Sequence, residues 1–316
     1  MRLTIKSWTI GCGILSVVLG SAAASAWAQG TLAEDSPPPA EASDSGSAPA
    51  EVEREAVTWV NPLREDIVQP GLSHHVMASE AIGEDVGYVV WLPEAYEAEP
   101  TRRFGVIYFL HGFGNNEAGA GRRFPAVVAD LVVKGAIEPV IVVCPNGGRS
   151  GYAGEVESMI INELIPLIDR EYRTIAATAS RGVAGFSMGG MGSVRLSLRH
   201  PELFGAAVSF GGGFRRGGEE AEQWLRDAAP TLKANGFALR SYNGDEDHPD
   251  AYADLYGVAK QVGLDYRHRV LTGTSHKVAR YMELAGPVAV GFLANHLDLR
   301  DRPAEDGDTT AEDGDR

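Results

Sequence analysis

The chain has 316 residues, 44% of them hydrophobic, and a formal net charge of −15. This length and apolar content are sufficient for one large core. The charge argues against a nucleic-acid partner, because nothing would offset repulsion by the phosphates. Much of the acidity lies outside the predicted fold, since residues 29–56 carry 7 acidic and 1 basic side chains and residues 301–316 carry 7 acidic and 2 basic.

The first 28 residues have the pattern of an export signal. Arg2 and Lys6 form a basic start, residues 10–24 are apolar and small, and Ala26-Trp27-Ala28 is an A-x-A cleavage site. The apolar run is too short and too rich in Gly and Ala for a good membrane span. We therefore predict a signal peptide over residues 1–28, no integral membrane span after its cleavage, and a periplasmic or extracellular protein.

Cleavage would leave one cysteine, Cys144, which cannot form an internal disulfide. It closes an apolar run and is predicted to be a small buried residue. Residues 29–56, rich in Ala, Ser, Pro and Glu, are predicted to be a disordered acidic linker. The folded domain is expected over residues 57–299, followed by a disordered acidic tail over 300–316.

Strands and helices are predicted to alternate along the folded domain. Residues 71–79 and 86–92 read as an antiparallel hairpin. Continuous apolar runs, typical of strands buried on both faces, come next. The further strands are predicted at residues 103–110, 139–144, 181–184, 204–210, 237–242 and 266–271. The helices are predicted at residues 124–134, 155–172, 188–200, 219–228, 250–262 and 278–296. The alternation predicts an α/β fold with a mostly parallel central sheet, an N-terminal antiparallel hairpin and helices on both faces.

The segment Gly185-Phe186-Ser187-Met188-Gly189 reads G-x-S-x-G, the pattern of a nucleophile elbow. In this turn a strand passes directly into a helix, and the serine at the apex is held in a strained conformation with its hydroxyl clear of the sheet. Gly185 and Gly189 are expected where strand and helix pass too closely for a Cβ. An apolar strand pattern precedes the motif and a helical pattern follows it, so Ser187 is the predicted nucleophile.

Ligand-facing groups of a parallel sheet lie at the carboxyl ends of its strands. Four such ends carry suggestive residues: His111-Gly112-Phe113-Gly114, Ser187, the turn with Asp245 and Asp247, and the loop 272–276. A serine needs a histidine to take its proton, and the histidine needs a carboxylate to fix its tautomer. The tetrahedral oxyanion needs preformed donors, for which the N–H groups of Phe113 and Met188 are candidates.

The histidine follows by elimination among eight. His111 is better placed to brace the oxyanion loop, His248 adjoins the acid turn and could not easily face it, and the others precede the sheet or lie within strands and helices. His276 remains as the predicted base. Three carboxylates crowd the acid turn at Asp245, Glu246 and Asp247, and spacing does not separate them.

Several blocks together resemble the esterase family of α/β-hydrolases, the group that contains esterase D, bacterial feruloyl esterases and the antigen 85 mycolyltransferases. The resemblance covers residues 86–297. Its blocks are Tyr108-Phe109-Leu110-His111-Gly112-Phe113-Gly114, Val142-Val143-Cys144-Pro145-Asn146-Gly147, Asn162-Glu163-Leu164-Ile165-Pro166-Leu167-Ile168-Asp169, Gly185-Phe186-Ser187-Met188-Gly189-Gly190-Met191-Gly192 and Arg199-His200-Pro201-Glu202-Leu203-Phe204.

The resemblance implies roles for two further residues. The family's G-x-x-D pattern matches Gly244 to Asp247, which favours Asp247 as the acid with Asp245 in reserve. Glu117 falls in the H-G-x-G-x-x-E position and is expected to support the oxyanion loop. The run Ser275-His276-Lys277-Val278 departs from the family's usual acidic and aromatic residues after the histidine, which leaves the local shape of the pocket open.

These features predict an exported serine carboxylesterase that works through an acyl-enzyme. Its predicted substrates are short-acyl or feruloyl-type esters, with carbohydrate-linked esters among them. An acyltransferase with the same triad and a non-catalytic binding protein on the same fold are the alternatives. No cofactor or metal is expected, because the acid turn lacks the ligand spacing of a calcium loop. The sequence does not indicate an oligomeric state. An apolar or aromatic pocket could be walled by Phe113, Tyr152, Phe186, Met188 and Phe214.

Overall fold

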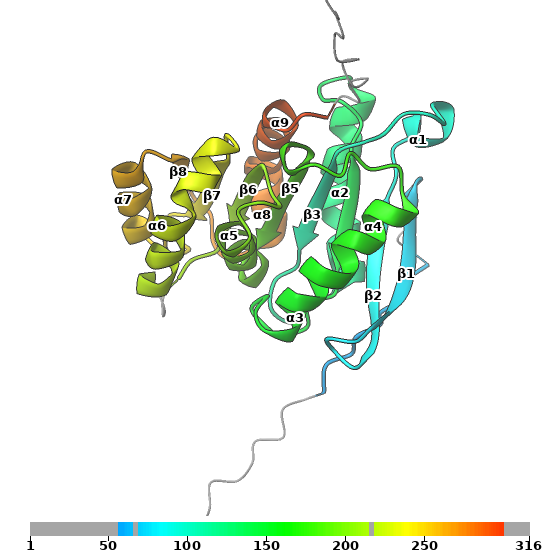
Figure 1. Ribbon diagram of the computed structural model, residues 1–316, viewed down its shortest axis with the longest axis horizontal. Helices are drawn as coiled ribbons and strands as arrows, with labels where there is room; N and C mark the ends of the chain where they lie inside the picture. The colour runs from blue at the N-terminus through cyan, green and yellow to red at the C-terminus, as the bar shows by residue number, and fades with distance from the viewer. Residues whose placement is uncertain (1–55, 66–68, 215–217, 300–316) are drawn as a thin grey trace, which may run out of the picture. The chain divides into compact units, whose positions relative to one another are not determined.

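The computed structural model describes residues 56–65, 69–214 and 218–299 (Figure 1). The predicted signal peptide at 1–28, nearly all of the predicted linker at 29–56 and the predicted tail at 300–316 lie outside the described residues. Strands and helices alternate through the described part of the chain, in the order that the apolar pattern predicted.

The centre of the fold is an eight-stranded sheet with the strand order β1-β2-β4-β3-β5-β6-β7-β8. In this sheet β2 runs antiparallel to both β1 and β4, and the pairs from β4 through β3 to β8 are parallel. The prediction of a mostly parallel sheet with an N-terminal antiparallel hairpin is confirmed. The strands are β1 Leu72–Ser79, β2 Glu84–Trp91, β3 Val106–Leu110, β4 Ile141–Pro145, β5 Arg181–Phe186, β6 Ala206–Phe210, β7 Ala238–Gly244 and β8 Asp265–Leu271.

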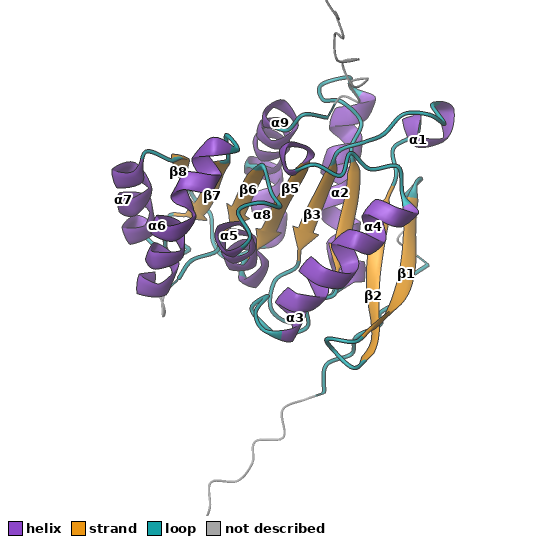
Figure 2. Ribbon diagram, viewed as in Figure 1, coloured by secondary structure: helices purple, strands orange, loops and turns teal. Residues whose placement is uncertain are grey.

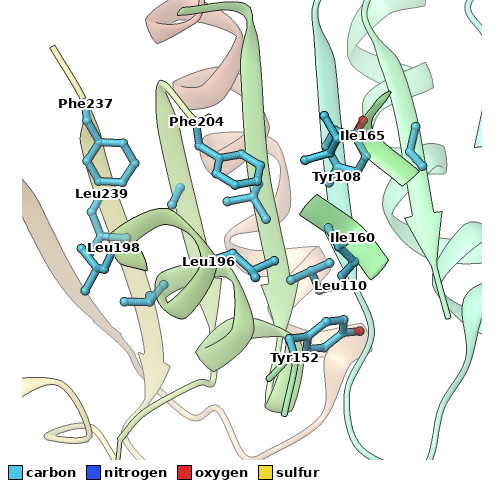
Figure 3. Close-up of a cluster of buried hydrophobic side chains, with 14 of the residues drawn as sticks. Tyr108, Leu110, Tyr152, Ile160, Ile165, Leu196, Leu198, Phe204, Phe237 and Leu239 are labelled. Atoms are coloured by element: carbon cyan, nitrogen blue, oxygen red, sulfur yellow. The ribbon is translucent and has the colours of Figure 1, made fainter. Parts of the chain in front are cut away.

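Helices cover both faces of the sheet (Figure 2). The α-helices are α1 Ala95–Ala98, α2 Glu117–Val133, α3 Glu155–Ser158, α4 Ile165–Glu171, α5 Met188–Arg199, α6 Gly218–Ala234, α7 Ala253–Val262, α8 Val278–Leu284 and α9 Gly286–His296. A core on one face joins the sheet to α3–α7, and part of it is drawn in Figure 3. A second core joins the other face to α2, α8 and α9. Cys144 is buried in this second core, as predicted, and its burial raises the pKa of its thiol.

The helix predicted at 124–134 starts earlier, at Glu117. Asn116 caps it, because its side-chain Oδ1 accepts a hydrogen bond from Gly119 N–H at 3.0 Å. Gly119 and Gly121 lower the helix propensity of the first two turns, so the sequence pattern did not predict these turns as helix. The cap matters for the site because it fixes the point where the loop after β3 becomes α2.

Two other predicted helices are not continuous. The helix predicted at 278–296 is broken at Ala285 into α8 and α9, because Pro287 has no N–H to continue the first helix and instead opens the second. The helix predicted at 155–172 contains a π-helical segment, Met159–Leu164, between α3 and α4. The short helix predicted at 219–228 extends to Ala234 and buries one side, including Leu225 and Leu232.

The strand order predicts a crevice at the carboxyl ends of β3 and β5, in the middle of the sheet. From β3 the chain moves to β4 on one side and then to β5 on the other. The segments after β3 and β5 enter helices on opposite faces, since α2 belongs to the second core and α5 to the first. The carboxyl ends of strands at such a reversal are where open α/β sheets bind ligands. The loop starting at His111 and the turn at Ser187 therefore meet at this crevice.

The turn from β5 into α5 is a close crossing of backbones. A Cβ placed on Gly189 would lie 2.0 Å from the carbonyl oxygen of Leu110, and one on Gly185 would lie 2.2 Å from that of Gly189. We expect Gly189→Ala to lower the free energy of unfolding by about 3 kcal/mol, because backbone must move to admit the methyl group. Urea denaturation measures this loss.

Gly257→Ala is the matched control for that substitution. Gly257 lies inside α7, and a Cβ there would meet nothing within 4 Å. Alanine in an open helical position should raise the free energy of unfolding by about 1 kcal/mol. Equal stabilities for the two variants would contradict the close crossing at the turn.

Candidate active site

Ser187 occupies the turn between β5 and α5 in a strained conformation. Its backbone has φ 56° and ψ −115°, in the region that side-chain-bearing residues rarely adopt. Two backbone hydrogen bonds hold it there: Ser187 N–H donates to Phe210 O at 2.8 Å, and Ser187 O accepts from Met191 N–H at 2.9 Å. The strain therefore belongs to the turn itself, from which the Ser187 hydroxyl reaches His276 Nε2.

His276 lies within hydrogen-bond distance of both other predicted residues. Its Nε2 is 2.7 Å from Ser187 Oγ, and its Nδ1 is 2.7 Å from Asp247 Oδ2. A carboxylate only accepts, so the proton is on Nδ1 and Nε2 accepts the serine hydroxyl hydrogen. The structure thus brings Ser187, His276 and Asp247 together in one chain of hydrogen bonds. This order lets the imidazole take the serine proton while the carboxylate holds its tautomer.

The acid turn separates its carboxylates by burial. Asp247 is 5% exposed and faces His276, whereas Asp245 is exposed and accepts hydrogen bonds from Thr274 N–H and Gly273 N–H. These two bonds lower the pKa of Asp245. Asp245 therefore ties the acid turn to the loop that carries His276, and it does not contact the imidazole.

The loop after β3 approaches Ser187. A Cβ on Gly112 would lie 3.3 Å from Ser187 Cβ, which places the N–H of Phe113 one residue from that contact. Met188 opens α5, and the N–H groups in the first turn of a helix have no partner within it. The two amides predicted as oxyanion donors therefore belong to the residue after Ser187 and to the residue after the Gly112 contact.

His111 is buried and contacts backbone. Its Nδ1–H donates to Gly112 O and its Nε2 accepts from Gly147 N–H, both at 2.9 Å. Burial lowers the pKa of His111, in agreement with a neutral ring. Tyr152 OH donates to His111 O at 3.1 Å. This residue braces the loop, as predicted, and connects it to the segment after β4.

Glu117 is fully buried at the start of α2. It accepts hydrogen bonds from the backbone N–H of Asn61, at 2.5 Å, and from the Asn61 side chain, at 3.1 Å. His74 Nε2 lies 3.2 Å from the same carboxylate. Glu117 therefore fastens the segment before β1 to the helix that follows the oxyanion loop, which agrees with the supporting role that the resemblance implied.

The other histidines have partners away from the serine. His75, His200, His268 and His296 bond respectively to Ser73, Glu157, Ser241 and Gly236. His248 is exposed, has φ 49° and lines the cavity described next. Among residues 56–65, 69–214 and 218–299, no group of three His, Cys, Asp or Glu side chains is arranged to hold a metal ion.

A cavity of about 390 Å³ opens at the serine. Its lining residues are Ser187, Met188, Met191, Gly211, Gly212, Gly213, Asp247, His248, Ala251 and His276. Of the five residues predicted to wall a pocket, Met188 does so. Tyr152 is buried beneath the loop after β3, and Phe113 is 65% exposed. Phe186 packs on His276 with ring centroids 4.9 Å apart, and Phe214 packs against Trp224 and Tyr252. Half of the lining residues are instead glycines and methionines, and the three triad residues are among the others.

Tyr281 was not predicted as part of the site. It is fully buried, and its hydroxyl donates to Asp247 Oδ2 at 2.6 Å and accepts from Gly244 N–H at 2.7 Å. It lies in the helical pattern that follows His276, where an apolar stripe gives no sign of the contact. A buried tyrosine hydroxyl needs a partner, but the sequence does not say which.

Comparisons with known proteins show the family and the fold. Residues 79–239 match the model of the family described as "Putative esterase". An endo-1,4-beta-xylanase/feruloyl esterase of Xylanibacter ruminicola is 30% identical over 228 residues, which make up 68% of this chain and 30% of that protein. An esterase of Mycobacterium tuberculosis is 31% identical over 256 residues, which make up 75% of this chain and 53% of that protein. The chain thus spans about half or less of the length of these relatives.

Among solved structures, a ferulic acid esterase has a TM-score of 0.64 at 21% identity, over 72% of this chain and 98% of that one. At this identity the likeness concerns the fold, and it confirms the predicted α/β-hydrolase architecture. No helix in the described ranges has the length and apolar character required to cross a membrane.

Proposed function

Since the chain belongs to the esterase family of α/β-hydrolases, as its motifs predicted, we propose that it is a serine carboxylesterase that works through an acyl-enzyme. The observation that carries the proposal is the continuous hydrogen-bond chain from Asp247 through His276 to Ser187, with both links at 2.7 Å. A non-catalytic binding protein would have no use for a strained serine in contact with a histidine and a buried carboxylate.

The chemistry follows from the protonation states. Ser187 Oγ attacks the ester carbonyl while His276 Nε2 takes its proton. The Asp247 carboxylate stabilises the imidazolium, and the N–H groups of Phe113 and Met188 receive the oxyanion. His276 returns the proton to the leaving alcohol, and the acyl group stays on Ser187. A water molecule, deprotonated by the same nitrogen, then releases the acid and restores the serine.

We propose a compact acyl group, of the short-acyl or feruloyl type, as substrate. The cavity at Ser187 has about 390 Å³, near the lower end of the range of small-molecule sites. The feruloyl alternative is supported by the name of the Xylanibacter ruminicola relative and by the fold of the ferulic acid esterase. A carbohydrate as the alcohol half of the ester is part of the same proposal.

An ester panel tests the function. Acetyl, butyryl, long-acyl and feruloyl esters are assayed, with product analysis in the presence and absence of a carbohydrate acceptor. We expect free acid to be the product. The kcat/KM for the long-acyl ester should be at least about tenfold below that of the best substrate, because the extra methylenes do not fit in a cavity that a compact acyl group already fills. Failure to cleave any ester would reject the proposal, and preferential transfer to the carbohydrate would identify an acyltransferase.

Export is also proposed, on the basis of the basic start, apolar run and A-x-A site in residues 1–28. Cells producing the full chain should hold the esterase activity outside the cytoplasm, in a protein whose sequence begins at Gln29. Activity confined to the cytoplasm with residues 1–28 intact would reject export and leave the catalytic proposal standing.

A further inference from the structure

Tyr281 is in contact with the acid turn through both hydrogen-bonding functions of its hydroxyl. The O–H donates to Asp247 Oδ2 at 2.6 Å, and the oxygen accepts from Gly244 N–H at 2.7 Å. Gly244 is the last residue of β7, so the hydroxyl fills the space between the end of this strand and the carboxylate that follows it. Both partners lie outside α8, the helix that carries Tyr281.

The Asp247 carboxylate needs such a donor. Its side chain is only 4% exposed, and burial of a charge is unfavourable unless hydrogen bonds stabilise it. Oδ2 receives two donors, His276 Nδ1–H and Tyr281 O–H. Burial raises the pKa of Tyr281, and its hydrogen bond to Asp247 raises it further. The hydroxyl therefore stays protonated and able to donate over the neutral pH range.

The tyrosine ring is also fixed relative to the base. Phe186 packs edge-on against Tyr281, with ring centroids 5.4 Å apart, and its ring lies 4.9 Å from that of His276. The residue just before the nucleophile thus contacts the base and the tyrosine together. The orientation of the carboxylate depends on this rigid set of rings, since rotation of Asp247 away from His276 would break the bond to Tyr281.

We propose that Tyr281 is a positioning residue that holds Asp247 Oδ2 against His276 Nδ1. The proposal rests on the proposed function, because it assigns Tyr281 an effect on catalysis that is exerted through the triad. The competing explanation is that the hydroxyl only satisfies a buried backbone amide, in which case it would affect stability and leave turnover unchanged.

Tyr281→Phe removes the hydroxyl and keeps the ring. We expect kcat per active site to fall about tenfold with KM unchanged, because a hydrogen bond to a charged group is lost and substrate does not touch Tyr281. Active sites are counted by fluorophosphonate labelling, so that kcat refers to the folded protein even if part of the sample is unfolded. Rates are measured below room temperature to keep the unfolded part small.

Tyr266→Phe is the matched control. Tyr266 is also a buried tyrosine, and its hydroxyl bonds to Ser241 at 2.8 Å, away from the triad. This variant should lose stability and keep the kcat of the wild type. Tyr281→Phe with wild-type kcat would overturn the inference, while an inactive wild type would overturn the proposed function itself.

A double-substitution cycle shows whether the effect passes through the acid. In an Asp247→Asn background, Tyr281→Phe should change kcat by less than about twofold, because the carboxylate that it positions is already gone. A full tenfold loss in the Asp247→Asn protein as well would mean that the effect does not pass through the carboxylate, and it would contradict positioning.

Discussion

Replacing Ser187 by alanine should lower kcat by about 10⁴-fold or more and abolish fluorophosphonate labelling. Every covalent step of the proposed mechanism passes through Ser187 Oγ, the hydroxyl that His276 Nε2 contacts. What remains would be binding and the oxyanion donors acting on water, which gives only a small part of the total rate. Labelling followed by mass spectrometry, and initial rates with the best ester of the panel, measure the two effects.

Ser197→Ala serves as the control for Ser187→Ala. Ser197 lies on the same helix, α5, and its hydroxyl donates to Val194 O at 3.0 Å. Labelling and kcat should match the wild type. Equal labelling of Ser187→Ala and wild-type protein would end the serine hydrolase proposal, whatever the activity.

The strain at Ser187 predicts a difference between two inactive variants. Alanine keeps the positive φ of 56°, whereas glycine adopts it without steric cost. Ser187→Gly should therefore unfold with a free energy about 1 kcal/mol higher than Ser187→Ala. Such a gain would show that the turn stores strain in order to present the hydroxyl.

The sequence predicted the sheet well because its strands are buried on both faces. In β3, β4 and β6 every residue is buried, and such strands appear as continuous apolar runs. Helix ends were less predictable. The capping contact of Asn116 and the break at Ala285 depend on local backbone geometry, which apolar periodicity does not record.

The residues of the site differ in how far the sequence alone could identify them. Ser187 follows from its own motif, and His276 from the positions of the other histidines. The acid could not be chosen from spacing, because Asp245 and Asp247 are two residues apart on one turn and only packing decides which is buried. Tyr281 could not be predicted, since its contact requires knowing how α8 lies against the end of β7.

The same turn supplies the second large effect: Asp247→Asn should lower kcat by about 10³-fold to 10⁴-fold near neutral pH. The amide group of asparagine can donate to His276 Nδ1, which moves the ring proton to Nε2. An Nε2–H cannot accept the proton of Ser187, although the shape of the site is unchanged. The asparagine Nδ2 then takes the place of Oδ2, where its two hydrogens can reach His276 Nδ1 and the Tyr281 oxygen, so the loss should be catalytic and the fold should persist.

Asp245→Asn is an equally conservative change two residues away, and it should lower kcat by less than about tenfold. Asparagine keeps one acceptor oxygen for the N–H groups of Gly273 and Thr274, and Asp245 does not contact His276. Rates for both variants, normalised to labelled active sites, make the comparison independent of expression. If Asp245→Asn loses activity as Asp247→Asn is expected to, while Asp247→Asn remains active, the acid is Asp245 and the Asp247 contact is structural. If both lose activity equally, the tie between the acid turn and the histidine loop is as important as the carboxylate itself. In that case Gly273 and Thr274 belong to the machinery that sets the position of His276.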